Sequence, residues 1–363
     1  KYHLPVKLIL IATSFGFLLN LMTLLLRYEN KAILFFIIII SGILVNFIIT
    51  YSLLSKFNYG ILAPIYGLLI SNALSFSALL LIKIKSLTKK LKVEQFKLIL
   101  SFGIQSSFAG LSFYLLDWID RLIINELLNL NDVGIYSLGY RLGAIINIFI
   151  VVPFSLIWAP MRMQYAKSNN IAFLTSKVMS YYTVVGVLVL LFTILFGEEI
   201  LKLIFVNEGY SEAFLITPII MTSLFIYGYQ NIVDFGIYLK KKVFFYIIIA
   251  IILIIINIIL NYVLIPKYGF FAASLVTLIT YFLSSTSIFF ISNAYFKLEI
   301  EIKRVLIPLL TVPIMFLLNY FLIYDMFIVK LFIMTLVFVL FYVFWLNNSE
   351  RNYLKKLNYK QWD

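Results

Sequence analysis

The chain has 363 residues, of which 63% are hydrophobic, 18% aromatic and only 12% charged. Soluble domains carry about 25% charged and about 45–50% apolar residues, so this composition excludes a water-soluble globular enzyme as well as a disordered chain. The absence of cysteine excludes disulfides and thiolate metal sites. The formal net charge of +13 raises the question of where the positive charges lie.

Long apolar segments predict an all-α, polytopic membrane protein. A helix needs about 20 apolar residues to cross the bilayer, and eleven segments, joined by short connections, reach that length. In chain order they are roughly 4–26, 32–54, 61–82, 98–125, 133–157, 178–197, 214–236, 244–264, 270–292, 305–324 and 327–346.

The lysines and arginines divide unequally between the alternating loops. Of the 29, 21 fall on one side of the membrane and 6 on the other, and only Arg121 and Arg141 lie within predicted spans. Because basic loops remain in the cytoplasm, this distribution predicts a cytoplasmic C-terminus and an N-terminus outside. Topology and attraction to anionic lipid headgroups account for the net charge, so nucleic-acid binding is not expected.

Part of the region 1–97, which holds the first three spans, recurs later in the chain. Residues 46–63 contain N-x4-Y and then YGxxA, and residues 257–272 contain both motifs again, offset by 209–211 positions. Both copies cross the membrane in the same direction, as in transporters built from parallel repeats. The repeat leaves spans four to six without a counterpart, which predicts that about three spans are missing before Lys1.

Ionisable residues in the fourth and fifth spans are candidates for a functional site, because charges inside the bilayer are costly. Asp117 and Arg121 lie four residues apart on one helix face, so Arg121 can pair locally or face the bundle interior and bind an anion. Arg141 lies in the adjacent antiparallel span, and a guanidinium suits two phosphate oxygens. Alternatively, Asp117 or Asp120 neutralises one arginine and the other snorkels to the interface.

The remaining polar residues of the spans allow structural and functional interpretations. Asp234 is expected to pair with the lysines at 240–242, or alternatively to carry a proton, so Asp117, Asp120 and Asp234 are candidates for ion pairing or coupling. Interhelical hydrogen bonds or a lining of the pathway are expected for Gln105, Asn147, Asn231, Asn257 and Asn261. Because no catalytic, nucleotide-binding or metal-ligating pattern is found, neither an enzyme nor a cofactor or metal is predicted.

Two regions resemble the polysaccharide flippases (O-antigen, capsule and teichuronic types) of the MOP superfamily. Phe271 stands where a second glycine is usual in that family. The resemblance implies a MATE-like bundle of two lobes: residues 1–97 as the second half of an incomplete N-lobe, 98–296 as a C-lobe of six spans, and 297–363 as two further spans and a cytoplasmic tail. The matching residues are Asp120-Arg121, Val133-Gly-Ile-Tyr-Ser137, Tyr140-Arg141, Trp158-Ala-Pro160 and the segment 257–277.

The resemblance also implies a function. It indicates a flippase of the bacterial inner membrane that moves a polyprenyl-pyrophosphate-linked oligosaccharide, such as an O-antigen, lipopolysaccharide or capsule repeat unit, by alternating access. Arg121 and Arg141 would contact the pyrophosphate or an anionic sugar, and the implied partners are the lipid-linked oligosaccharide, membrane lipids and polysaccharide assembly proteins. Two alternatives remain open: a multidrug or cation exporter of the same superfamily, which would favour acidic cavity residues, and a membrane polysaccharide polymerase or ligase.

Overall fold

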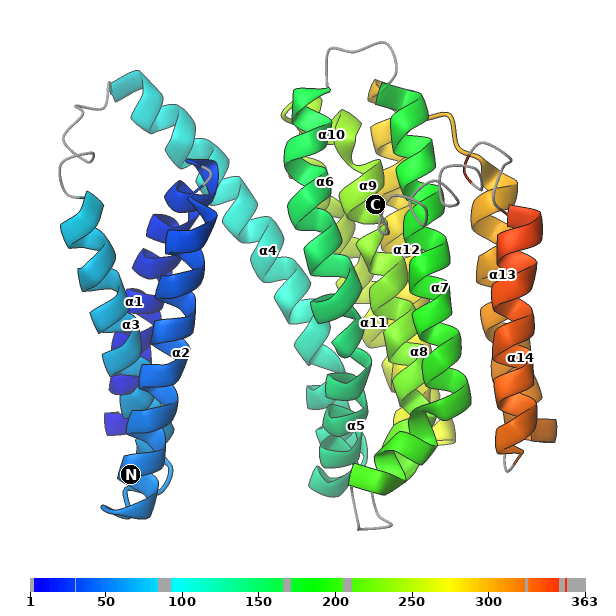
Figure 1. Ribbon diagram of the computed structural model, residues 1–363, viewed down its shortest axis with the longest axis horizontal. Helices are drawn as coiled ribbons and strands as arrows, with labels where there is room; N and C mark the ends of the chain where they lie inside the picture. Colours follow the sequence, from blue (N-terminus) through cyan, green and yellow to red (C-terminus); the bar gives the residue numbers. More distant parts are fainter. Residues whose placement is uncertain are drawn as a thin grey trace, which may run out of the picture. The chain divides into compact units, whose positions relative to one another are not determined.

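A computed structural model describes residues 3–29, 31–83, 93–165, 171–204, 211–323, 326–345 and 350, and its regular elements in that part of the chain are helices (Figure 1). Nine of the described helices are long and apolar enough to cross a membrane, and a shorter apolar helix occupies Phe327–Val343. Each of the eleven predicted spans coincides with helical structure, so the prediction of an all-α polytopic membrane protein is confirmed.

The chain divides into two compact units, Lys1–Lys97 and Leu98–Asp363, called unit 1 and unit 2 below. Unit 1 contains α1 (His3–Tyr28), α2 (Ala32–Ser55) and α3 (Leu62–Lys83), and α3 packs against both other helices. Gly67 lies at the α2–α3 contact, where an added Cβ would come within 2.5 Å of Asn46 Oδ1. Small residues and polar contacts thus join these helices, as is usual where lipid weakens the hydrophobic drive for packing.

Unit 2 holds the remaining helices, and its first helix starts a few residues before the boundary. In chain order the elements are α4 (Val93–Leu127), α5 (Leu130–Gly143), η2 (Asn147–Val151), α6 (Val152–Gln164), α7 (Ile171–Ile204), α8 (Ser211–Gly228), α9 (Gln230–Val233), α10 (Phe235–Leu239), α11 (Phe244–Tyr268), α12 (Phe270–Tyr295), α13 (Ile302–Leu318), η4 (Asn319–Ile323), α14 (Phe327–Leu340) and η5 (Phe341–Trp345).

Two predicted spans are interrupted instead of continuous. The span at 133–157 becomes α5, the π-helical turn η2 and α6, with the N–H of Val152 donating to the carbonyl of Asn147. Pro153 follows this turn and has no N–H with which to continue the α-helical ladder. The span at 214–236 breaks at Tyr229 and again at Asp234, giving α8, α9 and α10.

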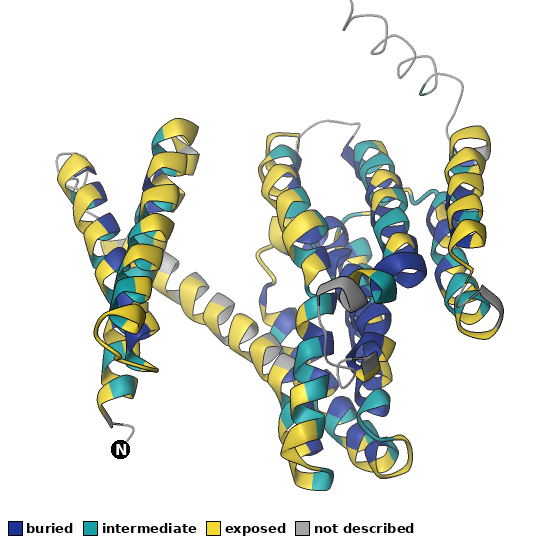
Figure 2. Ribbon diagram, turned by 60° about the horizontal axis from the view of Figure 1, so that its bottom comes forward, coloured by how far each residue is buried: buried dark blue, intermediate teal, exposed yellow. Residues whose placement is uncertain are grey.

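The helices α8 and α12 form the centre of unit 2. The helix α8 packs against α5, α7 and α12, and α12 also packs against α11. Gly139 lets α5 approach α8 closely, since an added Cβ would lie 2.5 Å from the carbonyl oxygen of Ala213 on α8. Buried residues concentrate in unit 2, whereas α1–α3 are largely exposed (Figure 2). Unit 2 therefore contains most of the positions at which a polar group is enclosed.

Candidate functional site

Asp120 on α4 is the most enclosed acidic residue of the described chain, with 1% of its surface exposed. Its carboxylate accepts hydrogen bonds from side chains on three other helices. Tyr136 Oη on α5 donates at 2.8 Å, Asn261 Nδ2 on α11 at 2.8 Å and Thr277 Oγ1 on α12 at 2.6 Å. A single carboxylate thus joins four helices of unit 2.

Asn257 and Asn261 lie one turn apart on α11 and complete the polar group around Asp120. Asn261 Nδ2 also donates to Asn257 Oδ1 at 2.9 Å. Within the described part of the chain, Asn257 Nδ2 and Asn261 Oδ1 are buried without a hydrogen-bond partner. A buried polar atom without a partner costs free energy. Asn261 Oδ1 therefore has spare capacity to accept from or coordinate a ligand, whereas Asn257 Nδ2 can only donate.

The oxygen atoms around Asp120 suit a proton or a small monovalent cation as a ligand. Carboxylate, hydroxyl and amide oxygens are hard ligands that prefer hard cations. The one acidic side chain supplies a single negative charge, which a proton or one monovalent ion neutralises. Among the residues that the structure describes, no cluster of three or more His, Cys, Asp or Glu side chains could hold a metal ion.

Arg121 follows Asp120 on α4, and aromatic rings surround its guanidinium. The carbon Cζ of Arg121 lies 5.0 Å from the ring centre of Trp118, 5.8 Å from that of Tyr136 and 4.5 Å from that of Tyr140. The negative faces of these rings attract the cation. Tyr136 contacts both Asp120 and Arg121, so the acidic and the basic residue share one positioning side chain.

The other predicted residues of this region are placed as follows. Arg141 is exposed on α5, directly after Tyr140, and Asn147 is half-buried at the start of η2. The side chains of Asp117 and Gln105 lie outside the part that the structure describes, so the predicted pair between Asp117 and Arg121 stays a prediction.

Asp234 forms a second buried polar group, with a partner that differs from the one expected. Its carboxylate pairs with the Arg162 guanidinium on α6 and accepts a hydrogen bond of 2.7 Å from Tyr246 Oη on α11. The lysines at 240–242, which the sequence suggested as partners, are exposed. Interior packing of α6 against the broken helix brings Arg162 to Asp234, although 72 residues separate them.

Arg162 also compensates for the helix break next to Asp234. Its Nη1 donates to the backbone carbonyl of Asn231 at 2.9 Å, and its guanidinium lies 5.1 Å from the ring centre of Tyr238. A helix break within the membrane is tolerated where other protein groups form hydrogen bonds with the freed backbone N–H and C=O groups. The Arg162–Asp234 group thus has a structural explanation, although Arg162 Nε is buried without a hydrogen-bond partner, as are two amide atoms near Asp120.

Sequence reasoning did not identify Tyr136, Thr277, Arg162 or Tyr246 as members of these groups. Tyr136 and Thr277 are part of the motifs that carry the family resemblance, but their hydroxyl groups alone indicate no role. Arg162 was counted among the basic loop residues, because it lies close to the end of its span. Only the packing of distant helices shows that these four side chains contact Asp120 or Asp234.

Comparison with known proteins places this geometry in context. Two solved structures are similar: a crystal structure of a MATE mutant (TM-score 0.64, 13% identity, covering 80% of this chain and 68% of that chain), and the lipid II flippase MurJ in an inward closed conformation (TM-score 0.59, 20% identity, covering 92% and 73%). At these identities the likeness establishes the fold alone, and it confirms the predicted MATE-like bundle. A comparison with curated protein sequences gave no match.

The family assignment comes from a profile match. Residues 7–215 match a family described as "Polysaccharide biosynthesis protein", which is more than half of the 363 residues. This match and the two structural likenesses agree with the resemblance to the MOP superfamily that the motifs indicated. The chain is therefore a multi-pass membrane protein that belongs to the polysaccharide biosynthesis protein family.

Proposed function

We propose that this protein is a cation-coupled flippase that moves a polyprenyl-pyrophosphate-linked oligosaccharide across the bacterial inner membrane by alternating access. Family membership and the transporter-like fold support the transport class. The observation that carries the proposal is the buried Asp120, which joins four helices and lies next to Arg121. The C-terminus is cytoplasmic in this proposal, as the distribution of lysine and arginine predicts.

Coupling follows from the charge at Asp120. A carboxylate accepts strong hydrogen bonds from Tyr136, Asn261 and Thr277, and neutralisation by a proton or monovalent cation weakens them. The four helices then have two arrangements whose free-energy difference depends on occupancy of the site, which is the requirement for a cation to bias a conformational equilibrium.

The substrate headgroup binds through the arginines in this proposal. The Arg121 guanidinium, held among three rings, can present two N–H groups to one phosphate. Arg141 supplies a second positive charge from α5, and the polyprenyl chain stays in lipid. Because Tyr136 contacts both Asp120 and Arg121, occupancy at the acid changes how the guanidinium is presented. The partners are the lipid-linked oligosaccharide, membrane lipids and polysaccharide assembly proteins.

A complementation experiment tests the arginines. The gene is expressed in a strain that lacks the corresponding polysaccharide flippase, and surface polysaccharide is measured together with the amount of protein in the membrane. Arg121→Ala and Arg141→Ala are expected to abolish surface polysaccharide while leaving insertion intact. Lys267→Ala, which removes an exposed positive charge at the end of α11, is the matched control and should leave the amount of surface polysaccharide unchanged. Normal polysaccharide in both arginine variants would overturn the proposed headgroup site.

A transport assay tests the coupling. Proteoliposomes are loaded with a fluorescent polyprenyl-pyrophosphate oligosaccharide, and flipping is followed under an imposed sodium or proton gradient. Asp120→Asn should flip at the same rate with and without the gradient, whereas Asp132→Asn, which alters a half-buried acid in the first turn of α5, should respond like the parent chain. An unchanged gradient response in Asp120→Asn contradicts coupling at this residue. Movement of a cationic drug in place of the lipid would instead identify an exporter.

A further inference from the structure

The hairpin of α13 and α14 is attached to α7 along its whole length. Polar contacts occur at three positions of α7: Lys177 pairs with Glu301 at 2.9 Å, the carbonyl of Ile194 accepts from Asn319 Nδ2 at 2.9 Å, and Glu199 pairs with Lys330 at 2.5 Å. In the last pair the Lys330 side chain is 2% exposed, whereas that of Glu199 is 35% exposed. These contacts hold α13 beside α7, as Figure 1 shows.

An apolar crevice of about 710 Å³ lies between α13 and the helices α7, α8 and α12. Its walls are aliphatic and aromatic side chains, for example Ile219, Leu275 and Leu310. The one side-chain hydroxyl in its lining belongs to Thr222 and donates to the carbonyl of Pro218 at 2.7 Å. The lining of the crevice therefore has no hydroxyl group that needs a partner from a ligand, and it suits a hydrocarbon chain.

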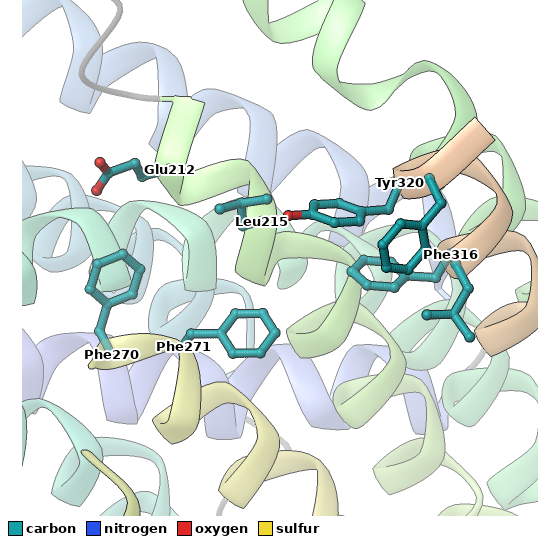
Figure 3. Close-up of a pocket in the computed structure, with 8 residues that line it drawn as sticks. Glu212, Leu215, Phe270, Phe271, Phe316 and Tyr320 are labelled. Carbon is teal, nitrogen blue, oxygen red and sulfur yellow. The ribbon is translucent and has the colours of Figure 1, made fainter. Parts of the chain in front are cut away.

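A second cavity of about 530 Å³ continues the crevice at the end of the bundle where α8 and α12 begin and α13 ends. Both cavities share Phe271, Phe316 and Leu317, so they are contiguous. Rings line the second cavity, and Glu212 is the one carboxylate in its lining (Figure 3). The rings are those of Phe270, Phe271, Phe316, Tyr320 and Phe321.

We propose that this continuous cavity binds a phospholipid whose headgroup carries an ammonium group, such as phosphatidylethanolamine. One acyl chain occupies the crevice, and the ammonium lies against the Glu212 carboxylate and the adjacent rings. Aromatic faces and a carboxylate both attract an organic cation. The same carboxylate repels an anionic headgroup, which distinguishes this lipid from phosphatidylglycerol and from the polyprenyl pyrophosphate of the proposed substrate.

The position of the cavity supports a headgroup at Glu212. Helix ends lie at the level where the bilayer becomes polar, and tyrosine prefers this level because its ring is apolar and its hydroxyl polar. Tyr320 and Glu212 supply these groups at the mouth, whereas the crevice behind them is apolar. An amphiphile matches this gradient of polarity, which neither a free hydrocarbon nor a soluble cation does.

Lipid binding to the purified, delipidated full chain tests the proposal. Palmitoyl-oleoyl phosphatidylethanolamine and the matched phosphatidylglycerol are titrated, and bound lipid is counted by native mass spectrometry together with the melting temperature. The ethanolamine lipid should bind about tenfold more tightly. Glu212→Gln should reduce this preference to about twofold or less. Glu126→Gln, which removes another exposed carboxylate near a helix end, should preserve it.

A pair of tryptophan substitutions tests the crevice separately. Leu275→Trp fills it and should abolish binding of both lipids, whereas Ile255→Trp on the exposed face of α11 should have no effect. Size-exclusion chromatography verifies folding, and Ile279→Trp replaces Leu275→Trp if that variant aggregates. Equal binding of the two lipids or an unchanged preference in Glu212→Gln overturns the proposal.

Discussion

The hairpins α2–α3 and α11–α12 share a sequence pattern, although residues 56–61 link the first pair of helices and Gly269 alone links the second. Gly60 and Gly269 occupy the same position of the two YGxxA motifs, and both have positive φ angles, 53° and 65°. The preceding helices carry equivalent polar pairs one turn apart: Thr50 Oγ1 donates to Asn46 Oδ1 at 3.1 Å, and Asn261 Nδ2 donates to Asn257 Oδ1 at 2.9 Å. The repeat seen in the sequence therefore corresponds to equivalent polar pairs and to a glycine of positive φ, whereas the linkers themselves differ.

The two hairpins differ in what the polar pair contacts. In unit 1 the side chains of Asn46 and Thr50 pack against Gly67 of α3. In unit 2, Asn261 reaches Asp120 of α4. The hairpin is thus a scaffold, and an acidic residue from a different helix converts one copy into a candidate ion site.

The two units also differ in where their charged residues lie. The charged residues of α1–α3 lie close to the helix ends, as Arg27 and Lys83 do. Unit 2 instead encloses Asp120, Arg162 and Asp234 in its interior. Because charges in the bilayer are costly, unit 2 depends on their pairing far more than unit 1 does.

The largest effect is expected where a buried pair is broken in unit 2. Arg162→Ala leaves the Asp234 carboxylate enclosed without its cation and should destabilise the protein by about 3–5 kcal/mol. Thermal unfolding in detergent measures the change. Lys83→Ala breaks the pair with the partly exposed Glu29 in unit 1 and should cost clearly less. Equal losses would remove the proposed difference between the units, and the double variant Arg162→Met, Asp234→Leu should recover most of the stability.

A smaller effect should distinguish the two polar pairs. Asn261→Ala removes a donor from the buried Asp120 and should cost about 1–3 kcal/mol, together with any stabilisation by sodium or by protonation. Thr50→Ala alters the equivalent position of unit 1, where no enclosed carboxylate loses a donor, and should leave the response to sodium and pH intact. Both are measured by melting temperature across sodium concentration and pH. A cation response that survives in Asn261→Ala would argue against this group as the ion site.

The glycine of the YGxxA motif should resist substitution in both hairpins. Gly60→Ala imposes a side chain on a positive φ, at a cost of about 1–2 kcal/mol. Gly269→Ala should cost more, because φ 65° and ψ −159° lie in a region that is essentially confined to glycine. An added Cβ meets nothing within 4 Å at either position, so the cost comes from the backbone alone. Chemical denaturation of the two variants measures it. A loss confined to one variant would show that the repeat does not extend to the energetics of its turns.

The smallest effect concerns the pH dependence of unit 1. Lys83 and Lys31 hold the pKa of the Glu29 carboxyl below its ordinary value of 4.5. A lowered pKa in the folded state contributes stability above pH 4.5, which is lost as the pH falls through the lowered value. Glu29→Gln should therefore flatten the acid side of the stability profile slightly, whereas Glu126→Gln, at a site without these lysines, should not. Identical profiles for Glu29→Gln and the parent chain would contradict this assignment.

The sequence alone determined the class of this protein and the positions of its spans. Bilayer thickness sets a fixed length for an apolar helix, so a local count of residues is sufficient. The repeat and the motifs around Asp120 and Arg121 were visible for the same reason, since each is a pattern within a short segment. The breaks at Tyr229 and Asp234 were not predicted, because a count of apolar residues tolerates a few polar residues such as Asn231 within a span and does not show where the helix breaks.

Only the tertiary structure decided which polar residues meet. Thr277 lies 157 residues from Asp120, and Asn261 lies 141 residues from it, yet both donate to its carboxylate. Similarly, Arg162 and not the nearby lysines pairs with Asp234. Several intramembrane residues could partner each acid, and local sequence carries no information on which helix faces become neighbours. Packing selects among them, because an enclosed polar group has to find its partners within the protein.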